Sequence, residues 1–301
     1  MEVLVTGASG FVGTALTATL RAAGHRPITA VRGQTVASGV DGIAWDPAQG
    51  SIDTPALEGI GGVVNLAGAG IGDRRWTAAR KQLVVDSRTR STELLSSALA
   101  KLKNPPGVFV SGSAVGYYGD RGDATLTEQD RSGDDFTARL CVSWEAATRP
   151  AAEAGIAVST IRTGIVLDAR GGMLGRIVVP FRLGLGGRLG SGRQYLSWIS
   201  MTDEVRAILF LLEHPEIAGP VNLTAPSPVT NAEFTTELGQ QLHRPTRVPT
   251  PLAPLRLVYG SELVRTLLLA SQRALPRVLM DAGFQFEHPT VDAALEAALA
   301  S

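Results

Sequence analysis

The chain has 301 residues, of which 44% are hydrophobic, so it can bury a large core. Lysine plus arginine and aspartate plus glutamate both number 28, which excludes a global charge that would attract nucleic acid or an anionic membrane. The single cysteine, Cys141, excludes an internal disulfide, and the four scattered histidines give no metal-ligand spacing, so we expect no metal.

Residues 3–13 predict a strand, a tight turn and the start of a helix. Aliphatic residues at 3–5 lead into Gly7-x-x-Gly10-x-x-Gly13, and apolar residues then recur at helical spacing to residue 23. Glycines 7 and 10 let bare backbone approach a diphosphate, which faces the helix N-terminus, while Gly13 lets the helix lie close to the strand. We predict dinucleotide binding here, with Gly7, Ser9, Gly10, Phe11 and Val12 as the contacting residues.

The second strand is expected at residues 27–31, and Arg32 follows it directly. Folds that prefer NAD place an acid near this position to bind the adenosine ribose. An arginine can instead pair with the 2′-phosphate of NADP, although a solvated arginine at a strand end is the simpler interpretation. We favour the phosphate contact, because no acid occurs before Asp41.

Residues 61–69 predict another strand, which ends in the small residues of Asn65-Leu66-Ala67-Gly68. These residues are expected at the carboxyl edge of the sheet, where ligands of open α/β folds bind, and they also suit a tight turn. A long helix is predicted over 76–102. It carries Arg88, which either contacts a phosphate of the cofactor or is solvated.

A strand at 108–111 leads into Gly112-Ser113-Ala114-Val115-Gly116-Tyr117-Tyr118-Gly119. Together with the glycine turn and the Asn-Leu-Ala-Gly segment, this stretch resembles the extended short-chain dehydrogenase/reductases, which include nucleotide-sugar epimerases. The resemblance implies that Ser113 is the catalytic serine, which hydrogen-bonds the substrate hydroxyl or carbonyl. Ser111, on the same strand, is expected to contact the cofactor.

The Tyr-x-x-x-Lys pair of that superfamily is missing. The three lysines are Lys81, Lys101 and Lys103, and none of them follows a tyrosine by four residues. Alignment of the helix expected from 135 to about 154 puts Thr137 and Cys141 in the two positions, and neither can supply a phenol or an ammonium group. Tyr117 and Tyr118 are expected to be packed aromatics near the cofactor, and Cys141 a small buried apolar group.

Residues 157–167 predict a strand that brings Gly164 and Val166 to the nicotinamide half of the cofactor. The Gly-rich segment from Pro180 to Ile199 follows. Its arginines at 182, 188 and 193 suit either a mobile loop that takes an anionic substrate or an ordinary exposed connection. A helix at 203–212 and a last strand at 219–224 complete the sheet.

The motifs Arg-Thr-Gly-Ile-Val-Leu, Pro-Phe-Arg-Leu-Gly-Leu-Gly-Gly and Gly-Ser-Gly-Arg-Gln-Tyr lie between residues 162 and 195. With the tail at 271–286, they resemble an atypical, epimerase-like family of NADP-dependent oxidoreductases, also described as cell-division-inhibitor-like, over essentially the whole chain. The resemblance implies an α/β, Rossmann-type doubly wound parallel sheet. We expect an NAD(P)-binding domain at 1–225, a substrate-side insertion at about 168–200, and a smaller helical C-terminal region at 226–301.

The resemblance implies that the cofactor is NADP(H) and that Arg32 and Arg88 contact it. Our leading hypothesis is an oxidoreductase that acts on a small carbonyl or sugar-like substrate, with Ser113 polarising the oxygen. Two alternatives stay open: a non-catalytic NADP(H)-responsive sensor or scaffold that acts on a protein partner, and a nucleotide-sugar epimerase, which the missing Tyr and Lys weaken.

The tail from about residue 250 is first Pro-rich, and helices are predicted at 255–270 and 290–300. We expect it to cover the substrate side and to offer a homodimer surface. The sequence begins without a basic, apolar leader, and runs such as 208–212 are too short to cross a bilayer. We therefore expect a cytoplasmic protein with no membrane segment.

Overall fold

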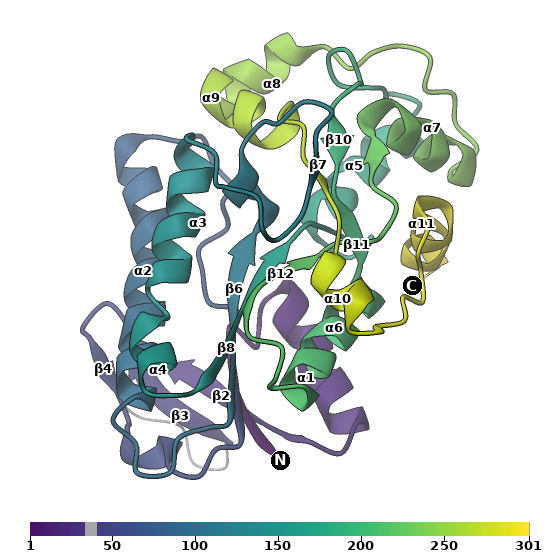
Figure 1. The fold of residues 1–301 in the computed structure, drawn as a ribbon. Coiled ribbons are helices and arrows are strands. Elements are labelled where there is room, and N and C mark those ends of the chain that lie inside the picture. The colour runs from purple at the N-terminus through teal and green to yellow at the C-terminus, as the bar shows by residue number, and fades with distance from the viewer. Residues whose placement is uncertain (34–40, 301) are drawn as a thin grey trace.

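The computed structural model describes residues 1–33 and 41–300, which fold around one eight-stranded sheet (Figure 1). All neighbouring pairs in this sheet are parallel except β3 and β4, which confirms the predicted doubly wound sheet. The order is β12-β8-β6-β5-β1-β2-β3-β4, so the winding reverses at β1. The strands are β1 (Glu2–Thr6), β2 (Arg26–Arg32), β3 (Gly42–Asp46), β4 (Ser51–Ile52), β5 (Gly62–Asn65), β6 (Val108–Ala114), β8 (Ala157–Thr163) and β12 (Gly219–Leu223).

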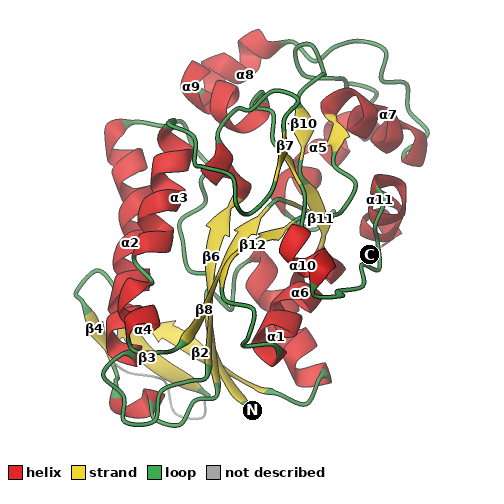
Figure 2. Ribbon diagram, in the orientation of Figure 1, coloured by secondary structure: helices red, strands yellow, loops and turns green. Residues whose placement is uncertain are grey.

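Helices cover both faces of this sheet (Figure 2). On one face, Leu16 and Ile208 pack with Val5 in a buried core, while on the other face Leu95 packs with Val63. Both faces of the sheet are therefore covered by apolar side chains, as a parallel sheet requires. The first face carries α1 (Phe11–Ala22) and α6 (Met201–Glu213), and the second carries α2 (Ala78–Leu99), α3 (Phe136–Ala146) and α4 (Arg149–Glu153).

The prediction of one strand at 157–167 is wrong in one respect, because the structure divides this segment into two strands at Gly164. A Cβ atom on Gly164 would lie 2.6 Å from the Ser197 carbonyl oxygen, so the chain approaches a neighbouring segment too closely for a side chain. The chain leaves the central sheet there, and the second piece, β9 (Ile165–Leu167), pairs in parallel with β11 (Trp198–Ser200).

The helix expected from residue 135 to about 154 is also divided. α3 ends at Ala146, and α4 begins at Arg149 with Pro150 in its first turn. Proline has no N–H to donate and its ring clashes with the carbonyl of the preceding turn, so Pro150 favours the start of a new helix over the continuation of α3.

The insertion and the tail share a third core, which includes Leu174, Phe181, Phe234 and Leu295. The described part of the insertion contains a helix that the sequence analysis did not predict, α5 (Gly172–Arg182). The expected helix at 255–270 is wrong as a single element, because Gly260, with a φ of +87°, divides it. The division into domains at residue 225 stays a prediction. The tail contains α7 (Asn231–Gln241), α8 (Leu252–Tyr259), α9 (Ser261–Leu263), a π-helical turn (Val264–Leu268), α10 (Arg277–Asp281) and α11 (Val291–Ala300).

One short strand pair joins the loop after β6 to the tail, and another joins the insertion to the segment after β12 (Figure 1). β3, β4 and these short strands were not predicted. β4 and the short pairs are two-residue runs, which carry too little periodicity to be read from sequence. Within the described residues, no helix is both long and apolar enough to cross a membrane. The short pairs are β7 (Thr125–Leu126) with β14 (Arg273–Ala274) and β10 (Tyr195–Leu196) with β13 (Val229–Thr230), and the 3-10 turns are Pro55–Leu57 and Val115–Tyr118.

The contact between α1 and β1 depends on Gly13, since a Cβ atom there would lie 2.1 Å from the Gly7 carbonyl oxygen. We expect Gly13→Ala to lower the free energy of unfolding by about 1–3 kcal/mol, because the helix must move away from the turn. The exposed Ala18→Ser on the same helix is the control and should change it by less than about 0.5 kcal/mol. Urea unfolding measures both, and an unchanged Gly13→Ala variant would contradict this packing.

Candidate functional site

The glycine turn lies at the carboxyl end of β1 and is held by close backbone contacts. Gly7 has a φ of +69°, and a Cβ atom on it would lie 2.9 Å from the carbonyl carbon of Leu66. The Gly10 amide donates to the Gly7 carbonyl oxygen over 2.9 Å, and Gly10 begins α1 without a side-chain cap. The first amides of α1 are therefore left for an acceptor from outside, as expected for a diphosphate site.

The other predicted residues of the turn lie open to a ligand. Ser9, Gly10 and Phe11 are exposed, and Val12 is partly buried. The Phe11 ring lies against the start of α5, where a Cβ atom on Gly171 would be 2.6 Å from ring carbon Cδ2. The sequence analysis did not predict this contact, which brings the insertion beside the glycine turn.

Arg32 is the last residue of β2, and it is exposed. None of the ion pairs among the described residues includes it. β2 is the neighbour of β1 on the side away from β5, so Arg32 lies on one flank of the glycine turn. This position suits the predicted contact with a 2′-phosphate.

A chain of buried hydrogen bonds fixes the loop that follows β5. Thr6 Oγ1 donates to Asn65 Oδ1 over 2.6 Å, and Asn65 Nδ2 donates to Thr92 Oγ1 over 2.7 Å. Trp144 Nε1 donates to the same Thr92 oxygen over 3.0 Å, and the Ala67 amide donates to Thr6 Oγ1 over 3.2 Å. The chain joins β1, β5, α2 and α3, so residues 65–68 are held in a defined position at the sheet edge.

Arg88 projects from α2 to this loop and is partly buried. Its Nη1 donates to the Ala69 carbonyl over 2.8 Å and to the Val84 carbonyl over 3.2 Å. Its guanidinium carbon lies 5.0 Å from the centre of the Trp144 ring, and a Cβ atom on Gly68 would be 3.1 Å from the same carbon. Desolvation lowers the pKa of Arg88 to about 10, so it is still cationic at neutral pH.

Ser113 is buried, and its hydroxyl donates to Glu145 Oε1 over 2.7 Å. Glu145 also accepts two hydrogen bonds of 2.9 Å from Arg162 Nε and Nη2, a bidentate pair. Burial alone disfavours the charge on Arg162, but Glu145 and Tyr118 raise its pKa above the ordinary value. The Ser113 hydroxyl thus already uses its proton in the hydrogen bond to Glu145, so its oxygen can offer only lone pairs to a ligand.

The sequence analysis missed Glu145 and Arg162 as the residues that hold Ser113. The available signal was Arg162 itself, a charged residue inside the otherwise uncharged strand at 157–163. A charge in a buried strand needs a partner, and that requirement points to an acid on the adjacent α3.

Thr137 and Cys141 supply no proton-transfer group. Thr137 Oγ1 donates to Asp135 Oδ1 over 2.7 Å, and the Cys141 thiol is 3.6 Å from the Ala114 carbonyl oxygen. Burial raises the pKa of the Cys141 thiol to about 12, so it is neutral at physiological pH. The two positions that the sequence analysis aligned with the Tyr-x-x-x-Lys pair thus hold buried side chains.

Tyr117 and Tyr118 are packed against the Ser113 network. The Arg162 guanidinium carbon lies 3.4 Å from the centre of the Tyr117 ring. The Tyr118 hydroxyl donates to Asn222 Oδ1 over 2.7 Å, and burial raises the pKa of Tyr118 to about 12. Tyr117 therefore contributes a ring face to the network, and Tyr118 contributes a hydroxyl group.

Three further predicted residues lie at the same edge. Ser111 is fully buried, and its hydroxyl has no hydrogen-bond partner among the described residues. Gly164 lies at the division between β8 and β9, next to Ser197. Val166, in β9, is buried in the hydrophobic core, and its contact with the cofactor stays a prediction.

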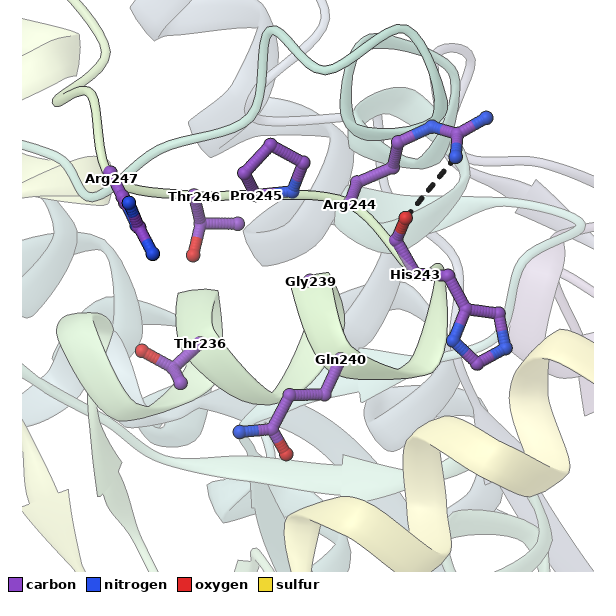
Figure 3. Close-up of a pocket in the computed structure, with 8 residues that line it drawn as sticks. All are labelled: Thr236, Gly239, Gln240, His243, Arg244, Pro245, Thr246 and Arg247. Atoms are coloured by element: carbon purple, nitrogen blue, oxygen red, sulfur yellow. Dashed lines mark hydrogen bonds between the residues drawn. The ribbon is translucent and has the colours of Figure 1, made fainter.

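The arginines of the Gly-rich segment are not gathered into one site. Arg188 donates to the carbonyl oxygens of Gly190 and Ser191, both over 2.9 Å, and Arg193 is exposed. The Arg182 carbonyl accepts from Arg244, which belongs to a separate cavity of about 720 Å³ along α7 (Figure 3). None of the predicted site residues lines this cavity, whose lining residues are Thr236, Gly239, Gln240, His243, Arg244, Pro245, Thr246 and Arg247.

The described parts of the chain contain no group of three or more histidine, cysteine, aspartate or glutamate side chains that could hold a metal ion. The site at the sheet edge is therefore built from glycines, hydroxyl groups and arginines. That composition suits a ligand rich in phosphate and hydroxyl oxygens.

The family described as NAD dependent epimerase/dehydratase matches residues 3–223, which include the glycine turn, Ser113 and Gly164. The chain belongs to this family. A second family, a domain of unknown function, DUF1731, matches residues 250–298 in the tail. These matches confirm the resemblance that the motifs indicated.

Three proteins that match at least 97% of this chain are also epimerases or epimerase family proteins by name. Epimerase family protein Mb2239 of Mycobacterium bovis is 48% identical over 97% of this chain and 96% of its own length. The crystal structure of the human epimerase family protein SDR39U1 (isoform 2) with NADPH has a TM-score of 0.90 at 36% identity and covers 100% of both chains. A nucleoside-diphosphate sugar epimerase from Corynebacterium glutamicum has a TM-score of 0.81 at 35% identity, over 99% of this chain and 58% of that one.

Glu204, in the first turn of α6, is a buried carboxyl group below the division between β8 and β9. It accepts a hydrogen bond of 2.9 Å from Thr163 Oγ1, and its other oxygen has no partner among the described residues. Burial raises its pKa from 4.5 to about 8. The folded state therefore keeps this proton over a pH range in which the unfolded state loses it.

Stability should fall as the pH rises from about 4.5 to 8, because the unfolded chain binds fewer protons in that window. Between pH 6 and pH 9 we expect the free energy of unfolding of wild type to fall by about 1–3 kcal/mol more than that of Glu204→Gln, whose amide mimics the protonated carboxyl group. Urea unfolding at both values measures this difference, with the exposed Glu216→Gln as the control. Parallel pH dependence in wild type and Glu204→Gln would contradict a buried, protonated Glu204.

Proposed function

We propose that this protein binds NADP(H) along the carboxyl edge of its sheet and acts as an oxidoreductase on a small carbonyl or sugar-like substrate. One observation carries the proposal: the glycine turn, the loop after β5 and Ser113 meet at one edge, with Arg32 on one flank of the turn and Arg88 on the other. The human relative crystallised with NADPH supports the same cofactor.

Each part of the edge has a separate task in this proposal. The amides of α1 bind the diphosphate, and Arg32 pairs with the 2′-phosphate. Ser111, Leu66, Ala67, Gly68 and Gly164 line the path towards the nicotinamide. Bound NADP(H) supplies the hydride chemistry, and the protein supplies orientation and a dry, shaped surface.

Ser113 is the candidate for contact with the substrate oxygen. Because its proton is donated to Glu145, its oxygen accepts a hydrogen bond from a substrate hydroxyl group. Glu145 and Arg162 then act as positioning residues, since they fix the rotamer of Ser113 from below.

The neutral pair of Thr137 and Cys141 favours a second candidate, an NADP(H)-responsive sensor or scaffold without turnover. Both candidates require cofactor binding, but only the oxidoreductase consumes it. Incubating the protein with NADPH and a panel of carbonyl compounds, and with NADP⁺ and a panel of alcohols and sugars, separates them. Consumption of cofactor supports the enzyme, whereas tight binding with no consumption across both panels supports the sensor.

The assignment of Arg32 predicts a specific change in cofactor preference. Arg32→Ala should weaken NADPH binding by about 10- to 100-fold and NADH binding by less than about twofold, since a charge-assisted contact to phosphate contributes about 1.5–3 kcal/mol. Calorimetry measures both affinities, and Arg21→Ala, on the exposed side of α1, is the control. An equal loss for the two cofactors would refute the phosphate contact.

A further inference from the structure

The segment between Ala69 and Trp76 crosses from the end of β5 to the start of α2 without helix or strand. Both of its ends are fixed. The Ala69 amide donates to Ser87 Oγ over 3.0 Å, and the buried Trp76 donates through Nε1 to the Ile71 carbonyl over 2.9 Å. Most of the residues between these two anchors are exposed, and we call residues 70–75 the strap.

One residue of α5, Arg176, holds the strap from the opposite side. Its Nη1 donates to the Gly72 carbonyl over 2.8 Å, and its Nη2 pairs with the Asp73 carboxylate. Both charged side chains are about half exposed, and exposed ion pairs are weak because water and salt screen them. The link between the strap and α5 can therefore break and form again while the rest of the protein stays folded.

This link completes a ring of contacts at the start of α1. α5 begins against the glycine turn, since a Cβ atom on Gly171 would lie 2.6 Å from the Phe11 ring. The turn lies against the loop after β5, where a Cβ atom on Gly7 would be 2.9 Å from the Leu66 backbone. That loop continues into the strap, and Arg176 joins the strap back to α5. The ring thus runs past the first amides of α1.

Of the three contacts that close the ring, the link through Arg176 is the one suited to open. The other two are close approaches of backbone to backbone and of backbone to an aromatic ring, and both help to position the glycine turn. A dinucleotide carries a bulky nucleoside at each end of its diphosphate. Its middle therefore cannot pass into a closed ring, and one contact has to open first.

We propose that the strap is a gate over the cofactor site, closed by the link between Arg176 and Asp73, which must open before NADP(H) enters or leaves. This inference rests on the proposed function, which puts the diphosphate at the first amides of α1. The link closes equally over the empty and the occupied site, so Arg176 and Asp73 are not ligands of the cofactor. Removing the link then raises both rates and leaves the affinity unchanged.

Stopped-flow fluorescence of NADPH measures both rates, and calorimetry measures the affinity. We expect Arg176→Ala to raise the association and dissociation rate constants by the same factor, at least threefold, and to change Kd by less than twofold. Arg182→Ala, at an exposed arginine in the last turn of the same helix, is the matched control. It should change none of the three values by more than twofold.

Asp73→Asn tests the other partner of the link. It should raise both rate constants in the same way as Arg176→Ala. Combining the two substitutions should add less than twofold to either rate, because the two side chains act through one contact. Should one of the variants fail to fold, the other carries the same comparison.

Unchanged rate constants in Arg176→Ala and Asp73→Asn would overturn the inference. A faster dissociation alone, with Kd raised by the same factor, would also overturn it, because Arg176 would then be a ligand of the cofactor. Rate constants that rise equally in Arg182→Ala would do the same. Wild-type protein that does not bind NADPH is a different result, which would contradict the proposed function itself rather than the gate.

Discussion

The contact between the glycine turn and the loop after β5 is the constraint on which the site depends. Gly7 approaches the Leu66 backbone so closely that a side chain would fit only if one of the two segments moved. The approach joins the two loops on either side of the point where the winding of the sheet reverses, which is where open α/β folds bind ligands. A diphosphate at the turn therefore lies beside the residues that lead towards Ser113.

Hydrogen bonds keep this arrangement in place from beneath. Thr6, Asn65, Thr92 and Trp144 form one buried chain through four elements, and Glu145 with Arg162 forms a second below Ser113. Buried polar groups of this kind rigidify a site when they are satisfied. The protein thus has a defined edge for a cofactor even though no lysine follows a tyrosine by four residues in this sequence.

Much of this could be predicted from the sequence, and the limits are physical. The glycine spacing and the apolar runs predicted the sheet, because these patterns are local. The division of β8 at Gly164 and the pairing of Glu145 with Ser113 depend on segments far apart in the chain, so no local pattern contains them. The direction of the Ser113 hydrogen bond could not be predicted either, since Ser113 lies on β6 and the acid that accepts the bond lies on α3.

A crystal structure of the protein with NADPH tests the central claim most directly. We expect the diphosphate at the amides that begin α1, the 2′-phosphate within hydrogen-bonding distance of Arg32, and the nicotinamide beside Ser113 and Gly164. A dinucleotide bound in the opposite direction, or density for it only in the cavity along α7, would contradict the site described for this fold.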